Sequence, residues 1–314
     1  MSAIGLEQAS LKTIMDDKAT QVTSKTAPAV LSASTPAGET MSTTNTVPTV
    51  AKQKSAFTQN MNAFLKMCIP PLFGLLLLAG IWTLISHQSP NLPGPLKTFY
   101  SAVELFSDPF YDNGPNDLGI GWNILASLER VSLGFGLAAL VGIPLGFIIG
   151  RFEFANKMCS PVISLLRPVS PLAWLPIGLL VFKAANPAAI WVIFISAVWP
   201  MIINTAVGVS KVPQDYMNVA KVLNLSEWKI VTKILFPFVL PYMMTGVRLS
   251  IGVAWLVIVA AEMLTGGVGI GFWVWDEWNN LNVEHIIIAI FIVGIVGLLL
   301  EVLLTQIAKR FSYE

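Results

Sequence analysis

VSLGFGLAALVGIPLGFIIG, residues 131–150, contains no charged side chain. A helix needs about twenty apolar residues to cross about 30 Å of hydrocarbon, and this stretch has that length. The whole chain of 314 residues is 54% hydrophobic and only 12% charged, whereas soluble proteins average roughly 25% charged residues. The sequence therefore predicts an all-α integral membrane protein and excludes a soluble enzyme.

Five further segments are also predominantly apolar over about twenty residues, which predicts six transmembrane helices in total. The third is the weakest, because Pro168, Pro171 and Pro176 interrupt it. Within a bundle, such prolines bend a helix where neighbouring helices satisfy the freed carbonyl groups. The predicted spans are residues 65–85, 131–150, 162–182, 188–209, 240–261 and 286–307.

The first sixty residues are rich in Ser, Thr, Ala and Pro and contain no aromatic residue before Phe57. Such a composition buries too little apolar area to offset the loss of chain entropy on folding. We therefore expect a disordered tail over residues 1–60 and a transmembrane domain over residues 61–314.

Lysine and arginine collect in alternate connections, and the other connections hold most of the acidic residues. Cations mark the cytoplasmic side of a membrane protein, so both termini are predicted to be cytoplasmic. The net charge of only +1 offers no basic surface for nucleic acid. The cations on the cytoplasmic side are Lys52, Lys54, Lys66, Arg151, Lys157, Arg167, Lys211, Lys221, Lys229, Lys233, Lys309 and Arg310.

Small residues recur at every fourth position of the second span, on one helix face. Such a groove lets another helix approach closely, and we expect that helix to come from the same chain rather than from a second copy. The groove residues are Gly134, Ala138, Gly142, Gly146 and Gly150.

Residues 211–237, which we call the coupling segment, are longer than a simple hairpin requires. Pro213 and Asp215 favour the start of a short helix, and Asn224 favours a left-handed end to it. Ser226 and Glu227 favour the start of the next helix. The apolar residues of this helix–turn–helix fit a groove on a soluble partner; an amphipathic helix on the membrane surface is the alternative.

The run NVAKVLNLSEWKIVTKILFP, residues 218–237, resembles the cytoplasmic signature of binding-protein-dependent ABC import permeases. That signature has an acid-Ala-Ala start, a glycine four positions on, and an Ile-x-Leu-Pro end ten positions later. The spacing matches, whereas several identities differ. Asn218, Val219 and Ala220 occupy the start, Asn224 the glycine, and Ile234, Phe236 and Pro237 the end.

The stretches at residues 127–151, 165–182 and 245–264 look like the permeases for nitrate, bicarbonate, taurine and aliphatic sulfonates. DPFYDNGPNDLGIGW, residues 108–122, narrows the resemblance to cyanobacterial nitrate/nitrite and bicarbonate permeases. The resemblance covers residue 65 to the C-terminus. It implies the type I ABC importer permease fold, in the inner (plasma) membrane, and anion import by alternating access. Nitrate or nitrite is favoured and bicarbonate is the alternative.

The resemblance also implies partners: a second permease copy forming a homodimer, two ATP-binding subunits, an external lipid-anchored substrate-binding protein, and the membrane lipid around the permease. The chain has no Gly-x4-Gly-Lys-Ser/Thr phosphate-binding loop, so ATP and Mg²⁺ are expected on the ATPase subunits, and no cofactor on this chain. The residues expected to couple to the ATPase are Asp215, Asn218, Val219, Ala220, Leu223, Asn224, Leu225, Ile234, Phe236 and Pro237.

Few charged residues mark a route for the anion through the predicted spans. Arg248 and Glu301 are the charged residues far from the ends of the predicted spans, at similar depths, and we hypothesise a contact between them. Ordinary bundle packing is the alternative role for each pathway candidate. The candidates for the translocation pathway or gate are Arg167, Trp174, Trp199, Arg248, Trp255, Glu262 and Met263.

Two other classes of protein fit the sequence less well. A secondary transporter or channel would show paired interrupted helices or an intramembrane acid relay, and neither is evident. A membrane-embedded enzyme would need a nucleophile or metal-ligand set, but His87 and His285 lie at outer span ends without ligand spacing. We therefore predict no catalytic residue and no metal site.

Overall fold

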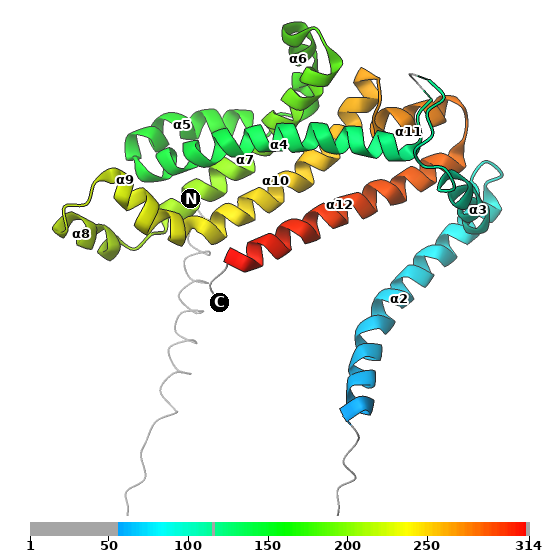
Figure 1. The fold of residues 1–314 in the computed structure, drawn as a ribbon, viewed down its shortest axis with the longest axis horizontal. Helices are drawn as coiled ribbons and strands as arrows, with labels where there is room; N and C mark the ends of the chain where they lie inside the picture. The colour runs from blue at the N-terminus through cyan, green and yellow to red at the C-terminus, as the bar shows by residue number, and fades with distance from the viewer. Residues whose placement is uncertain (1–55, 115–116, 312–314) are drawn as a thin grey trace, which may run out of the picture. The chain divides into compact units, whose positions relative to one another are not determined.

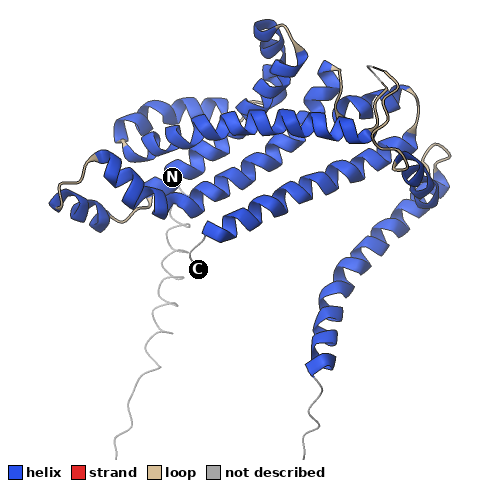
Figure 2. Ribbon diagram, in the orientation of Figure 1, coloured by secondary structure: helices blue, strands red, loops and turns tan. Residues whose placement is uncertain are grey.

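The computed structural model describes residues 56–114 and 117–311. The chain divides into two units, Met1–Ala63 and Phe64–Glu314, and every helix from Pro95 onward belongs to the second. Helices account for nearly all of its secondary structure, with no strand among the described residues (Figure 2). The all-α prediction is confirmed. Residues 1–55 of the predicted tail lie outside the described residues, and the first described helix begins at Ala56, before residue 61.

Five helices are long and apolar enough to cross a membrane, or six when one bent pair counts as a span, which agrees with the predicted number. The elements are α2 (Ala56–Gln88), α3 (Pro95–Leu105), α4 (Ile120–Arg151), α5 (Glu153–Leu166), the 3₁₀ turn η1 (Pro171–Trp174), α6 (Leu175–Phe182), α7 (Ala185–Ser210), α8 (Gln214–Val222), α9 (Glu227–Ile230), the π turn η2 (Val231–Leu235), α10 (Phe236–Thr265), α11 (Ile270–Asn279) and α12 (Val283–Phe311).

The third predicted span differs from the prediction of one helix over residues 162–182. It is a bent pair in which α5 already begins at Glu153, and the direction changes by 96° between Leu166 and Pro171. Proline disfavours the helical conformation of the residue before it and removes a backbone donor. Pro168 and Pro171 therefore end one helix and start the next.

The centre of the second unit is formed by α4, α7 and α10, which lie side by side (Figure 1). The helix α7 occupies the small-residue groove of α4. A Cβ atom on Gly134 would lie 2.7 Å from Ile193 Cβ, and one on Gly146 would lie 2.6 Å from Thr205 Cβ. The groove therefore serves packing within the chain, because only glycine permits this backbone approach.

A π turn joins α9 to α10, so the helical path runs without interruption from Glu227 to Thr265. The Thr232 hydroxyl donates to the Trp228 carbonyl oxygen at 2.8 Å beside this turn. Beyond it, the ring of Phe236 stacks on Phe147 of α4 with centroids 6.3 Å apart. The end of the coupling segment is thus continuous with a central helix of the bundle.

Candidate functional site

The helix α8 ends in a Schellman motif, which is the C-terminal turn that the sequence favours. Asn224 follows the helix with φ 45°, in the left-handed region. The Leu225 N–H donates to the Ala220 carbonyl at 3.0 Å, and the Asn224 N–H donates to that of Lys221 at 3.0 Å. These two bonds satisfy carbonyl groups that would otherwise lack partners at the helix end. The turn therefore fixes the direction in which the chain continues to α9.

One face of α8 is packed and the other is open. Met217 and Ala220 are buried in an apolar cluster with Leu235 of η2 and Val239 of α10. The opposite face exposes large apolar side chains, of which Val222 is 85% exposed. Grouped apolar side chains on a surface are typical of a protein interaction site. The exposed apolar residues of α8 and its end are Tyr216, Val219, Val222 and Leu223.

The predicted coupling residues divide between these two environments. Asp215, Asn218, Val219, Leu223 and Asn224 are exposed. Ala220 is fully buried, and Leu225 and Ile234 pack partly against the apolar cluster beneath α8. Phe236 and Pro237 lie further along, in the first turn of α10. Residues 215–225 thus form one surface element, and the Ile-x-Phe-Pro end is part of the helix that supports it.

An ion pair connects the coupling segment to α4. The Arg151 guanidinium, in the last turn of α4, contacts both carboxylate oxygens of Glu227 at 3.1 and 3.3 Å. Arginine matches a carboxylate with two parallel hydrogen bonds, which fixes orientation as well as distance. The start of α9 is therefore held against the end of α4.

A buried polar network lies at the other end of the bundle. The Glu262 carboxylate, 1% exposed, accepts hydrogen bonds from the Ser127 hydroxyl at 2.8 Å and from the Gly271 N–H at 3.0 Å. Arg130 approaches the same carboxylate at 2.5 Å and donates from Nε to the Asn186 side chain at 2.9 Å. The carboxylate is therefore both hydrogen-bonded and charge-paired, as a buried ion requires.

The same network holds the loop before α11. The Ile270 N–H donates to the Ser127 hydroxyl at 2.9 Å, and the Gly269 N–H donates to the Asn123 side chain at 2.9 Å. A Cβ atom on Gly271 would overlap the Val259 carbonyl oxygen, so this position admits only glycine. Close packing against α10 thus requires glycine at Gly269 and Gly271, whereas Gly266 and Gly267 have positive φ angles of 75° and 94°.

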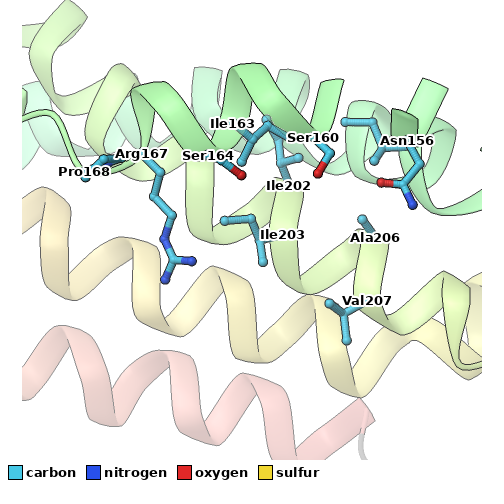
Figure 3. A pocket seen from close by; sticks show the side chains of 11 residues that line it. Asn156, Ser160, Ile163, Ser164, Arg167, Pro168, Ile202, Ile203, Ala206 and Val207 are labelled. Atoms are coloured by element: carbon cyan, nitrogen blue, oxygen red, sulfur yellow. The ribbon is translucent and has the colours of Figure 1, made fainter. Parts of the chain in front are cut away.

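A groove of about 620 Å³ lies between α5 and α7. Figure 3 shows four polar side chains of α5 and its end pointing to the same side, over Ile203, Ala206 and Val207 of α7. The remaining wall is apolar. The polar residues are Asn156, Ser160, Ser164 and Arg167.

Residues 142–313 match the family model of the binding-protein-dependent transport system inner membrane component. The chain belongs to this family. The permease is 50% identical to the nitrate import permease protein NrtB of Synechocystis over 234 residues, which cover 74% of this chain and 85% of that protein. It is 44% identical to NrtB of Synechococcus elongatus over 271 residues, which cover 84% of this chain and 96% of that protein.

A bicarbonate permease and a methionine transporter of known structure are also similar to this chain. The bicarbonate transport system permease protein CmpB of Synechocystis is 48% identical to the permease over 237 residues, covering 74% of this chain and 85% of that protein. A structure of the MetNI methionine ABC transporter in inward-facing conformations aligns with a TM-score of 0.54 at 12% identity, over 60% of this chain and 94% of that one. This structural likeness establishes the type I ABC importer permease fold.

The predicted pathway residues of the permease do not gather at one site. Trp255 is 3% exposed, and its Nε1 donates to the Val293 carbonyl at 2.9 Å, so it packs α10 against α12. Glu262 lies in the buried network. Trp174, Trp199 and Met263 are half-buried. Arg167 and Arg248 are exposed, and of all the predicted pathway residues, only Arg167 lines the groove along α5.

The hypothesised contact between Arg248 and Glu301 is wrong for a single subunit. Both side chains are exposed, and no ion pair joins them although both belong to the described residues. Equal depth in a membrane does not determine which way two side chains point around their helices. Sequence reasoning missed the true partner of Glu262, because Arg130 lies 132 residues away and no local pattern links the two.

Proposed function

We propose that this permease is the translocation subunit of an ATP-driven importer of nitrate or nitrite. The observation that carries the proposal is its 44–50% identity to three nitrate import permeases. Bicarbonate is the second candidate, since relatives named as bicarbonate permeases are 47–48% identical. The binding protein that delivers the anion would decide between these substrates.

The proposed assembly contains two copies of the permease, two ATP-binding subunits and an external lipid-anchored substrate-binding protein. ATP and Mg²⁺ belong to the ATP-binding subunits, and this chain holds no cofactor. The coupling segment faces the cytoplasm, with both termini on the same side. The exposed apolar face of α8 supports this assignment, because it offers a rigid helix to a groove on a soluble subunit.

Transport would then proceed by alternating access. Closure of the ATP-binding subunits displaces α8, and its buried face passes the displacement to α10 through Leu235 and Val239. The Arg151–Glu227 ion pair passes it to α4. Rigid-body movement of these helices exposes a central route to one side of the membrane and then to the other.

The coupling role is tested by Val222→Asp in the complete complex, reconstituted in vesicles with the ATP-binding and substrate-binding subunits. A buried carboxylate at the subunit contact is costly, so ATP-driven nitrate uptake should fall at least tenfold while membrane insertion stays normal. Val222→Ile is the matched control and should keep most of the uptake. Undiminished uptake by Val222→Asp would contradict the coupling role.

Competition experiments test the substrate. ATP-driven uptake of labelled nitrate by the same vesicles should be inhibited by unlabelled nitrate and nitrite and only weakly by bicarbonate. Stronger inhibition by bicarbonate than by nitrate would favour the second candidate. Uptake that continues without ATP would instead indicate a secondary transporter or channel.

A further inference from the structure

The groove between α5 and α7 has a polar wall whose residues recur with helical spacing. Asn156, Ser160, Ser164 and Arg167 follow one another by four, four and three residues, so they occupy one face of the helix and its end. Together they extend over about 17 Å along the helix axis. This face lies in an apolar span, where serine, asparagine and arginine are costly unless they meet a polar partner or water.

The chemistry of this wall favours an anion. None of the eleven side chains around the groove carries a carboxylate. Arg167 forms no ion pair with any described residue, so its guanidinium is available to a ligand. Two hydroxyls and an amide supply neutral hydrogen-bond donors along the rest of the wall. A cation would find no compensating charge in this groove.

The facing wall limits how tightly a ligand is held. It consists of Ile202, Ile203, Ala206 and Val207 of α7, whose side chains donate no hydrogen bonds. An ion in the groove is therefore contacted from one side only and keeps part of its water shell. Passage through a pore requires binding that is favourable but weak, and a one-sided row of neutral donors meets this requirement.

The position of the groove relates it to the coupling segment. Its lining includes Ile149, two residues before the Arg151 that pairs with Glu227, and Val207, in the last turn of α7 before α8. Arg167 lies at its far end, where the 96° bend interrupts the span. The prediction that Arg167 lies in the cytoplasmic connection before the third span is therefore wrong, because α5 already begins at Glu153. The groove thus leads along the exposed polar face of α5, from the bend to the end that carries the coupling segment.

We propose that this groove is the coupling-side section of the route for a small monovalent oxyanion. Arg167 draws the ion to the bend, and Ser164, Ser160 and Asn156 then offer successive weak contacts toward the cytoplasm. The proposal rests on the proposed function, because it assigns a path for the same transported anion. It further requires that charged solutes reach the groove and that Arg167 makes the groove prefer anions.

Transport measurements on Arg167 variants form the first test. Arg167→Gln should lower nitrate uptake at least tenfold, while ATP hydrolysis stimulated by the nitrate-loaded binding protein stays within twofold. Arg167→Lys should retain more uptake than Arg167→Gln, since it keeps the charge. Lys157→Gln, an exposed cation of the same helix outside the groove, is the matched control and should transport normally. Normal uptake by Arg167→Gln would overturn the proposal.

A labelling experiment tests the groove independently of the transported substrate. In a Cys68→Ser/Cys159→Ala background, Ser160→Cys and Ser164→Cys should react at least fivefold faster with an anionic thiol reagent than with a cationic one of similar size. Adding Arg167→Glu should reverse this preference. Equal rates with both reagents, or no reaction at all, would overturn the proposal.

The two experiments separate this proposal from the proposed function. If the wild-type complex takes up no nitrate but the labelling shows the expected preference, the groove is an anion route and the nitrate assignment is wrong. If nitrate uptake is normal and labelling shows no preference, the nitrate assignment stands and the groove is not its route.

Discussion

The Arg130 guanidinium lies 2.5 Å from the Glu262 carboxylate, and the two residues are only 8% and 1% exposed. Arg130 belongs to the first half of α4, and Glu262 belongs to the last turn of α10. Ser127 and Gly271 donate to the same carboxylate. One buried ion pair therefore joins the first half of α4 to the end of α10 and to the loop that precedes α11.

Removing one partner of this pair should be strongly destabilising. Arg130→Gln leaves a buried carboxylate without its counter-charge, and such changes typically cost about 3–5 kcal/mol. We expect a clear fall in the thermal unfolding midpoint of the purified complex, measured by the fluorescence of its tryptophans. The double variant Arg130→Gln/Glu262→Gln should recover much of the loss, because it removes both charges.

The exposed pair Glu153–Lys157 provides the control for that cycle, with side chains that are 82% and 76% exposed. Surface pairs at this spacing contribute roughly 0.3–0.5 kcal/mol. Lys157→Gln should therefore leave the midpoint almost unchanged. A double variant no more stable than Arg130→Gln alone would show that the charges are not coupled.

Gly146→Ala should destabilise the permease. The added methyl group would lie 2.6 Å from Thr205 Cβ and 2.8 Å from the Ile202 carbonyl oxygen, both on α7. Overpacking of this kind costs about 1–3 kcal/mol. Gly136→Ala is the matched control, since nothing lies within 4 Å of its Cβ position. The thermal unfolding midpoints of both variants are the measurement. A higher midpoint for Gly146→Ala than for Gly136→Ala would contradict the prediction.

Asn224→Gly should leave folding and transport nearly unchanged, whereas Asn224→Val should impair both. The φ of 45° at this position is accessible to glycine and asparagine, but costs other residues about 1–2 kcal/mol, and more for a β-branched side chain. Protease sensitivity of the coupling segment reports the local loss of structure. Equal resistance of the two variants would mean that the left-handed turn does not stabilise the end of α8.

Trp255→Phe should reduce stability without changing the nitrate concentration that gives half-maximal uptake. The indole N–H donates to the Val293 carbonyl and the ring packs against Gly297, so the substitution removes a buried hydrogen bond worth about 1 kcal/mol. A loss of apparent affinity at unchanged stability would restore Trp255 as a pathway residue.

The spans and the coupling segment are predictable because their signals are local. Hydropathy marks each helix, and the spacing of Asn224 and Pro237 from Asn218 marks the turn and the helix that follows it. The start of the third span was not predicted because Glu153, Asn156 and Lys157 lower the hydropathy of the first turns of α5. The Arg130–Glu262 pair was not predicted because side-chain rotation and helix packing decide which distant charges meet.

The π turn between α9 and α10 has a consequence for the winding of this helical path. Eight residues of regular α-helix would leave Phe236 about 80° around the axis from Trp228, whereas the extra residue taken up by a π turn reduces this offset to about 20°. Both side chains accordingly line one apolar groove beside Phe147. Deletion of a single residue from Val231–Leu235 would therefore rotate α9 about the helix axis relative to α10. Trp228 would then no longer lie on the same side of the helical path as Phe236.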